Sequence, residues 1–278
     1  MQEEQVHPLL GIAIEACLAA GKEIMEVYAG SFSVDHKDDR SPLTEADRRS
    51  HTVIANILRS TGLPVLSEEG GEIAREERMA WQRYWCVDPL DGTKEFVKRN
   101  GEFTVNIALM ERDELPAGPM GRSKPVLGLL YAPDTDVLYF AWKGAGAFRQ
   151  KEAATRTGVS AYERIAMSTP LPAEADRDTY IILASRSHRN PETDAFIKIM
   201  EEKHSDIAIN SMGSAYKFGL LAEGTADPYP RYAPTMEWDT AAGQIICNEA
   251  GKELTDVTTN APMRYNKNEL VNNWFIVQ

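Results

Sequence analysis

Hydrophobic positions near the start of the chain recur every three or four residues, which is typical of an amphipathic helix. The pattern runs from Leu9 to Tyr28, and Gly30 provides an end for the helix. A second helix is predicted to begin at Thr44, because Thr44 and Asp47 have the spacing of a capping box. Two helices are therefore expected to open the chain.

Short, continuous apolar runs come next, and runs of this length predict strands rather than helices. They lie at residues 65–66, 84–87, 103–110, 126–131 and 137–142. No helical pattern separates the last three runs, so these strands are expected to pair directly with one another. The pattern indicates a mixed or antiparallel sheet in this half of the chain.

The second half of the chain alternates between strand and helix patterns, which predicts an α/β layer arrangement. The strands are expected at residues 180–184, 207–209 and 274–277, and the helices at residues 190–203, 214–222 and 239–250. A polar stretch with little periodicity precedes them, and we place a domain boundary within it. The prediction is an α+β domain of residues 1–165 that carries most candidate metal ligands, followed by an α/β domain of residues 166–278.

Composition and charge exclude some classes of protein. Of the 278 residues, 43% are hydrophobic and 26% are charged, which fits a folded globular protein. The net charge is −12 and no run of four Lys or Arg occurs, so binding to a nucleic acid polymer is not expected. If the substrate is an anion, the binding site has to supply its own local positive charge.

The cysteines and residues 1–7 indicate the cellular compartment to expect. The three cysteines are odd in number and widely spaced, which fits a reducing compartment better than a disulfide framework. Residues 1–7 are polar and lack the basic segment of a signal peptide. We therefore expect a cytoplasmic protein, with weak attachment to the inner membrane face left open. No obligate protein partner is expected, and the oligomeric state stays open.

Acidic residues gather where predicted elements end or begin. Glu68 and Glu69 follow the strand at residues 65–66, and Asp239 stands at the start of the last helix. Between them in sequence, the motif Asp-Pro-Leu-Asp-Gly-Thr at residues 88–93 directly follows the strand at residues 84–87. Taken alone, Glu68 and Glu69 are more typical of a solvated loop, while the central motif is equally typical of a turn and Asp239 of a helix cap. Their joint occurrence favours one shared site.

The central motif has the chemistry of a magnesium site. Pro89 is expected to end the strand, because proline fixes φ and lacks an N–H. Gly92 permits a backbone conformation that other residues resist. Asp88 and Asp91 would then point at one spot, with the carbonyl of Leu90 between them. Such hard oxygen ligands suit Mg²⁺ rather than Zn²⁺, and phosphoryl transfer uses clusters of this kind.

Three motifs together resemble the signature motifs of the inositol monophosphatase superfamily. They are Ser67-Glu68-Glu69, the segment at residues 85–93 and Trp-Asp-Thr-Ala-Ala-Gly at residues 238–243. The resemblance covers nearly the whole chain, with the motifs in the right order and spacing. It implies a layered α-β-α-β-α sandwich and a lithium-sensitive, Mg²⁺-dependent phosphatase.

The resemblance also implies roles for particular residues in an attack by metal-activated water. The metal ligands, for two or three Mg²⁺ ions per site, would be Glu68, Asp88, Leu90 through its carbonyl, Asp91 and Asp239. The catalytic residues would be Asp47, Thr93 and Glu68.

Finer features are similar to the 3′(2′),5′-bisphosphate nucleotidases of the bacterial CysQ type. They lie at residues 94–108, 185–188, 213–217 and 229–231. This likeness implies hydrolysis of adenosine 3′,5′-bisphosphate to AMP and phosphate, as part of sulfur metabolism. The implied substrate-binding residues are Leu90, Asp91, Gly92, Thr93, Lys94, His188, Ser214, Lys217, Arg231 and Asp239.

Two alternatives and one departure stay open. The first alternative is a phosphatase of the same superfamily that acts on inositol monophosphate or fructose 1,6-bisphosphate. The second is a catalytically silent nucleotide-binding protein, which the full set of expected ligands disfavours. The departure is Glu237, where a neutral residue is expected; it would either change metal affinity or face solvent. Taken without the resemblance, Lys217 and Arg231 would be interpreted as solvated surface charges.

Overall fold

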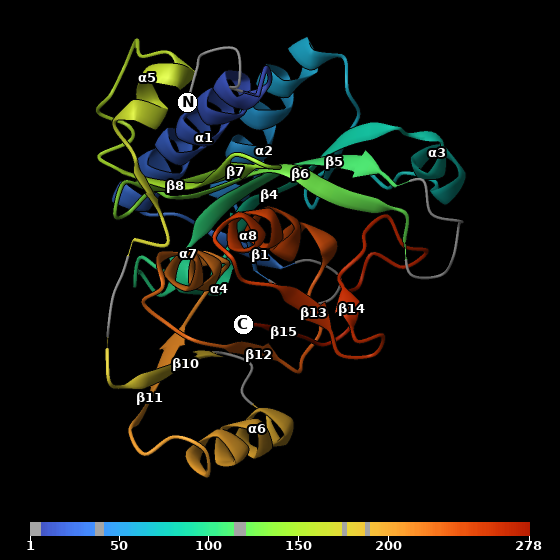
Figure 1. Ribbon diagram of the computed structural model, residues 1–278. Coiled ribbons are helices and arrows are strands. Elements are labelled where there is room, and N and C mark those ends of the chain that lie inside the picture. Colours follow the sequence, from blue (N-terminus) through green and yellow to red (C-terminus); the bar gives the residue numbers. More distant parts are fainter. Residues whose placement is uncertain (1–6, 37–41, 114–120, 174–176, 187–189) are drawn as a thin grey trace.

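The computed structural model describes residues 7–36, 42–113, 121–173, 177–186 and 190–278. It confirms the layered α/β sandwich (Figure 1). Helices α1 (Leu10–Ala29) and α2 (Glu45–Leu58) cover one face of a seven-stranded sheet. Helices α7 (Tyr216–Glu223) and α8 (Glu237–Glu249) lie against the opposite face, with smaller sheets beyond them. Helix α6 (Pro191–Glu201) is outermost, which completes the α-β-α-β-α order.

The large sheet is mixed, as the directly successive strands predicted. In spatial order its strands are β3 (Val65–Ser67), β4 (Arg83–Asp91), β5 (Thr104–Arg112), β6 (Ser123–Ala132), β7 (Val137–Trp142), β8 (Gly146–Lys151) and β9 (Thr169–Leu171). Only β3 and β4 pair in parallel, and every other neighbouring pair is antiparallel. Sequence patterns missed β8 and β9, which lie in glycine-rich and polar segments.

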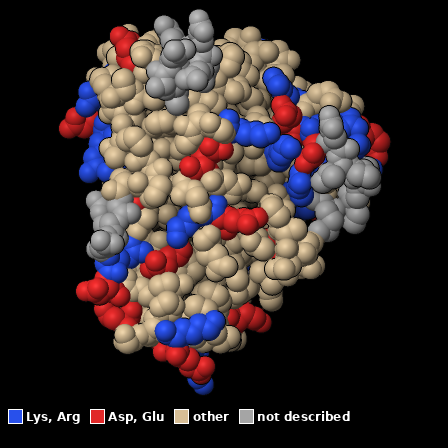
Figure 2. Space-filling view, in the orientation of Figure 1, with Lys and Arg blue, Asp and Glu red and all other residues tan. Residues whose placement is uncertain are grey.

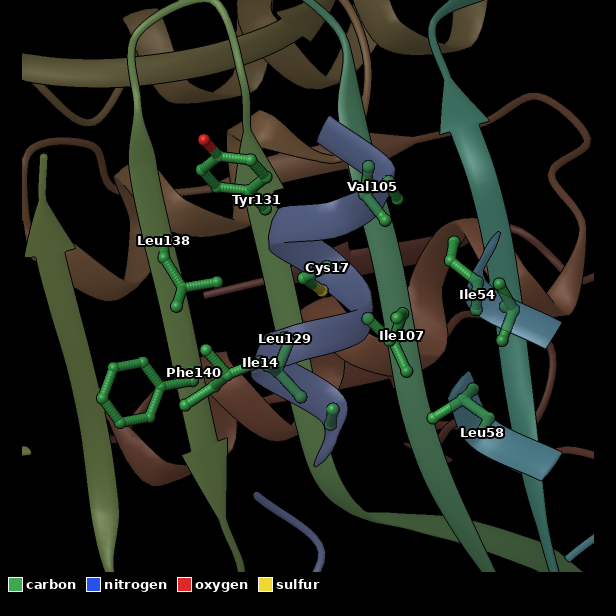
Figure 3. Close-up of a cluster of buried hydrophobic side chains, with 14 of the residues drawn as sticks. Ile14, Cys17, Ile54, Leu58, Val105, Ile107, Leu129, Tyr131, Leu138 and Phe140 are labelled. Carbon is green, nitrogen blue, oxygen red and sulfur yellow. The ribbon is translucent and has the colours of Figure 1, made fainter. Parts of the chain in front are cut away.

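One hydrophobic core fills the space between this sheet and the first two helices (Figure 3). Ile14 and Cys17 come from α1, and Ile54 and Leu58 come from α2. They pack against β5, β6 and β7, where Leu129 is among the buried partners. Each aliphatic side chain buried in this way stabilises the fold by roughly 1.5–3 kcal/mol. This core fixes α2, whose first turn carries Asp47.

Helix α8 packs closely on the other face of the sheet. A Cβ placed on Gly128 of β6 would lie 2.4 Å from Cγ2 of Ile245 and 2.7 Å from the carbonyl oxygen of Ala242. No larger residue fits there, so the helix approaches the backbone of the strand directly. This contact fixes the position of α8, whose first turn carries Asp239.

The smaller sheets lie in the second half of the chain. Strands β10 (Tyr180–Ser185) and β11 (Ile207–Met212) pair in parallel. A four-stranded sheet has the order β12 (Tyr229–Arg231), β15 (Phe275–Val277), β13 (Leu254–Asp256) and β14 (Ala261–Pro262). The strands and helices expected in this half are confirmed, with shifts of a few residues at their ends. The division into domains of residues 1–165 and 166–278 stays a prediction.

Short elements complete the described part of the fold. They are β1 (Val34–His36), β2 (Pro42–Thr44), the 3₁₀ turn η2 (Arg59–Thr61), α3 (Arg75–Ala80), α4 (Thr93–Val97) and α5 (Ala161–Ala166). Helix α4 follows β4 almost at once, after the single residue Gly92 at φ 93°. A left-handed φ of this size favours glycine, which explains the choice of residue at this sharp exit from the strand.

The expectation that Pro89 ends its strand is wrong, because β4 continues to Asp91. The ladder with β5 is irregular at this point: Asp88 pairs with Asn106, whereas Asp91 pairs with Thr104. Three residue steps on β4 thus face two on β5, which is a bulge. Pro89 lies inside the bulge, where its missing N–H breaks no regular ladder bond. The proline therefore shapes the strand at the acidic motif instead of ending it.

The surface carries charges of both signs. Figure 2 shows Lys and Arg side chains interspersed with Asp and Glu over the face in view, without one large basic patch. In the described ranges, no helix combines the length and the apolar character needed to cross a membrane. The expected cytoplasmic location stays a prediction.

Candidate active site

A pocket lies where the segment after β4 meets the second half of the chain. Its predicted lining residues from the first half are Glu68, Asp91, Gly92, Thr93 and Lys94. Its predicted lining residues from the second half are Ser214, Lys217, Arg231 and Asp239. The structure therefore brings candidate residues that are far apart in sequence into one cavity.

Asp47 is oriented by the first turn of α2. The backbone N–H and the hydroxyl of Thr44 both donate to Oδ2 of Asp47, at 2.7 and 2.6 Å. This is the capping box that the sequence predicted. The second oxygen, Oδ1, accepts a hydrogen bond from the Thr93 hydroxyl at 3.1 Å. The structure thus brings Asp47 and Thr93 together at the pocket.

The bulge in β4 and the start of α8 bring three carboxylates together. The N–H of Leu90 donates to Oδ1 of Asp88 at 3.0 Å, which fixes that side chain within the bulge. Asp239 is the third residue of α8, and its Oδ2 accepts the N–H of Met236 at 2.8 Å. One carboxylate oxygen from each of Asp88, Asp91 and Asp239 lies within 4.8 Å of the other two.

Glu68 adds a fourth carboxylate to this acidic group. It follows β3 directly, and its N–H donates to the carbonyl of Val87 at 3.1 Å, one residue before Asp88. Its carboxyl forms a hydrogen bond with the Asp88 side chain. The parallel pairing of β3 with β4 therefore delivers Glu68 to the acidic group.

Burial and mutual repulsion raise the pKa values of this group. Burial and the charge of Glu68 together raise the pKa of Asp91 to about 6, against the opposing effects of Lys217 and the N–H of Ala215. Burial, with the charges of neighbouring carboxylates, raises the pKa values of Asp88 and Asp239 well above the usual aspartate range. Asp47 shifts likewise, to about 6, mainly through burial.

These residues fit a divalent cation. All the donors are oxygens, and three of the side chains are within reach of a single ion. A bound cation would offset the repulsion that remains between these carboxylates. Oxygen-only ligand sets are the ones that Mg²⁺ prefers in proteins.

Two buried cations also line the pocket. Lys217 is 3% exposed and Arg231 is 8% exposed, so the interpretation of either as a solvated surface charge is wrong. Nη2 of Arg231 donates to the carbonyl of Pro234 at 3.2 Å, while its buried Nε has no hydrogen-bond partner among the described residues. Burial and the charge of Arg231 together lower the pKa of Lys217 to about 8, against the opposing effect of Asp91. An anion between these two cations would relieve their repulsion.

The turn before α7 differs from the sequence expectation. The helix was expected to begin at Ser214, but it begins at Tyr216, and Ser214 has a φ of 46°. The N–H of Ala215 donates to Oδ2 of Asp91 at 2.5 Å. Nζ of Lys217 donates to three carbonyls, those of Met212, Gly213 and Ser214, at 2.6–3.2 Å. Side chains of the pocket thus hold this turn in a conformation that local sequence does not favour.

Glu237 is fully buried, so the suggestion that it faces solvent is wrong. Its carboxylate accepts the N–H groups of Asn266 and Lys267 at 2.7 and 3.0 Å. Nζ of Lys267 donates to the same carboxylate at 2.8 Å and forms an ion pair with it. These bonds tie the start of α8, two residues before Asp239, to the loop that follows β14.

One predicted site residue is not among those described, and one wall of the pocket was not predicted. His188 lies outside the described residues. Sequence reasoning missed Phe218, Tyr229 and Phe275, whose side chains also line the pocket. The Tyr229 ring packs edge-on against both phenylalanine rings and faces Nζ of Lys217 at 5.0 Å. Their sequence pattern matches that of ordinary core residues, and it gave no signal of a pocket.

Comparison with known proteins agrees with this geometry. Residues 5–275 match the inositol monophosphatase family. The chain is 43% identical over 241 residues to the 3′(2′),5′-bisphosphate nucleotidase CysQ of Salmonella typhimurium, covering 85% of this chain and 86% of the relative.

Solved structures show the same similarity. The crystal structure of CysQ from Bacteroides thetaiotaomicron, described as a bacterial member of the inositol monophosphatase family, superposes with a TM-score of 0.85 at 46% identity. It covers 96% of this chain and 95% of its own. An inositol monophosphatase from Thermotoga maritima shares the fold with a TM-score of 0.71 at 24% identity, over 98% of this chain and 92% of its own.

The raised pKa values predict how pH and Mg²⁺ act on stability. Without metal, the folded state holds protons on Asp47 and Asp91 that the unfolded state releases at lower pH. These groups therefore lower the free energy of unfolding as pH rises from roughly 4 to 6. Because Mg²⁺ competes with these protons, the increase in Tm that it causes should grow over the same range. Thermal unfolding at several pH values, with and without Mg²⁺, measures this difference. An increase that is the same at every pH would contradict it.

The buried ion pair predicts a large loss of stability when one partner is removed. Lys267→Met leaves the carboxylate of Glu237 buried without its cation, so the free energy of unfolding should fall by about 3–5 kcal/mol. Arg83→Met is the control, because it breaks an exposed ion pair with Glu111 and should cost less than about 1 kcal/mol. Chemical denaturation of both variants measures these losses. Similar small losses would show that the buried pair contributes no more to the free energy of unfolding than the exposed pair does.

Proposed function

The chain belongs to the inositol monophosphatase family, and we propose that it is a Mg²⁺-dependent nucleotidase that hydrolyses adenosine 3′,5′-bisphosphate to AMP and phosphate. The observation that carries this proposal is the mixed charge of the pocket. Its carboxylates fit a divalent cation and its lining also includes the buried cations Lys217 and Arg231, and we infer that these form an acidic end and a cationic end. A substrate with two phosphates has one charged group for each end.

The cationic end favours a bisphosphate over a monophosphate. A buried guanidinium with an unused N–H is costly unless an anion accepts from it. Arg231 has such an N–H, and Lys217 adds a second positive charge beside it. Inositol monophosphate would place one phosphate at the acidic end and leave the cationic end without an anion. Fructose 1,6-bisphosphate has two phosphates, but relatives 42–43% identical to this chain are named as nucleotidases.

Several residues would hold the metal. Asp88, Asp91, Asp239 and Glu68 offer carboxylate oxygens, and Leu90 offers its carbonyl. Mg²⁺ bound there would polarise the phosphate and lower the pKa of a water molecule that it binds. The number of ions and the involvement of Glu68 as a ligand belong to the proposal.

Thr93 and Asp47 would orient and deprotonate the attacking water. The hydroxyl of Thr93 donates its proton toward Asp47, which leaves its oxygen lone pairs to accept a hydrogen bond from water. Asp47 has a pKa raised to about 6, and it is ionised near neutral pH and able to accept a proton. The backbone at Gly92 and Lys94 lines the pocket beside Thr93, where it would meet the scissile phosphate.

A catalytically silent binding protein is the alternative of another class. It would need no intact set of metal-binding and water-orienting groups. Asp47 and Thr93 are hydrogen-bonded, and the three aspartates converge, so the chain retains the arrangement that turnover needs.

Removing one ligand charge should stop turnover without unfolding the protein. Asp91→Asn keeps an oxygen that can accept the N–H of Ala215 but removes one negative charge from the acidic group. We expect kcat at saturating Mg²⁺ to fall by more than about a hundredfold, with a metal-free Tm equal to or above that of the wild type, because the variant lacks a charge that is unfavourable in the folded state. Phosphate release and thermal unfolding check both points. Near-normal turnover would exclude Asp91 as a metal ligand.

The role of Arg231 tests the choice of substrate. Arg231→Ala removes a charge-assisted contact, so KM for adenosine 3′,5′-bisphosphate should rise by about 10- to 100-fold. KM for adenosine 3′-monophosphate, which has no second phosphate, should change by less than about threefold. Arg83→Ala, on an exposed pair away from the pocket, serves as the control. Equal rises for both substrates would show that Arg231 does not bind the second phosphate.

A further inference from the structure

One turn in the pocket is held in a strained conformation. Residues 212–215, here called the 212–215 turn, connect β11 to α7, and the last three of them line the pocket. Ser214 in this turn has a φ of 46°, a left-handed conformation that is unfavourable for residues other than glycine. Such a conformation persists only where the surrounding contacts impose it.

Some of these contacts come from the pocket itself. Lys217 donates to the carbonyls of residues 212–214, and Asp91 accepts the N–H of Ala215. Both residues already have a place in the proposed function. Their contacts act on the carbonyls and on the last N–H of the turn.

A further contact comes from Glu102, which lies between α4 and β5 and outside the pocket lining. Its Oε2 accepts the N–H of Gly213 at 2.8 Å. Nε and Nη2 of Arg186 donate to its two oxygens at 3.0 and 2.6 Å. Nη2 of Arg186 also donates to the carbonyl of Ser211 at 2.7 Å. One carboxylate from the first half of the chain therefore holds two segments of the second half.

The packing around this carboxylate leaves little room for movement. A Cβ placed on Gly213 would lie 2.5 Å from Cγ of Glu95 and 3.1 Å from the carbonyl oxygen of Glu102. A Cβ placed on Gly92 would lie 2.8 Å from that same carbonyl oxygen and 3.1 Å from Cβ of Ser214. The two glycines thus allow the turn, the backbone of residue 102 and the segment after β4 to meet at one point.

We propose that Glu102 and Arg186 are positioning residues that hold the 212–215 turn against Gly92 and so set the separation between the two ends of the pocket. This inference rests on the proposed function. Lys217 follows the turn by two residues, so a shift of the turn moves the cationic end of the pocket relative to its acidic end. A bisphosphate has to place a phosphate at each end at once, whereas a monophosphate has to place one only at the acidic end.

The pair can be removed without unfolding the protein. The side chains of Arg186 and Glu102 are 44% and 17% exposed, and ion pairs of partly exposed side chains contribute little to stability. Glu102→Ala removes the carboxylate altogether, and Arg186→Lys keeps the charge but loses the two parallel N–H donors. Glu111→Gln is the control, because it breaks the pair with Arg83, in which the side chains are 35% and 54% exposed.

The kinetic test compares two nucleotides in the presence of Mg²⁺. In Glu102→Ala, KM for adenosine 3′,5′-bisphosphate should rise about tenfold, with a smaller rise in Arg186→Lys. The kcat values and KM for adenosine 3′-monophosphate should change by less than about twofold, as should every constant of Glu111→Gln. An equal rise in KM for both nucleotides, or no rise, would overturn the inference.

Amide hydrogen exchange tests the same inference without any substrate. The N–H of Gly213 should exchange faster in Glu102→Ala than in the wild-type protein or in Glu111→Gln, because its acceptor is gone. Unchanged exchange would overturn the positioning role. If the wild-type protein itself does not prefer the bisphosphate, the proposed function fails, and the exchange result alone decides whether Glu102 fixes the turn.

Discussion

The convergence of several carboxylates at one point is the constraint on which the rest of the site depends. Asp88, Asp91 and Asp239 approach one another within 4.8 Å in a part of the protein that raises their pKa values. Repulsion between like charges would separate them if the chain were free to move. The fold resists this by fixing each one to rigid backbone: a bulged strand holds two, and a helix that packs on the sheet holds the third.

Helix N-termini offset part of this repulsion, because they stabilise negative charge. Asp47 and Asp239 are each the third residue of a helix, and each accepts a backbone N–H from the residue before the helix. Those N–H groups and the helix dipole favour negative charge at these positions. The same geometry that stabilises the helix therefore orients an acidic side chain toward the pocket. The remaining repulsion is what a divalent cation would offset.

Sequence patterns predicted the parts of the structure that depend on local interactions. The Thr44–Asp47 capping box, the first helix and the long strands all follow from spacings of a few residues. Strand β8 was missed because its glycine-rich segment is held by ladder partners on β7 and β9. Pro89 was misread for a similar reason, since only the pairing with β5 shows that it lies in a bulge.

In the candidate site, too, the sequence predicted the features that depend on local interactions. The acidic motifs predicted the acidic end of the pocket because each motif is short and continuous in sequence. The burial of Lys217 and the ion pair between Glu237 and Lys267 depend on segments that meet only in the folded chain, and no local pattern carries that information. The contact of Glu102 with Arg186 is of the same kind.

The most direct test of this account is to measure phosphate release from adenosine 3′,5′-bisphosphate and from inositol 1-phosphate side by side, with and without Mg²⁺. The two-ended pocket predicts release from the nucleotide that requires Mg²⁺ and exceeds release from the inositol compound. A preference for inositol 1-phosphate would leave the acidic end as described and contradict the role given to Lys217 and Arg231. No release from either compound would contradict the account as a whole and support a silent binding protein.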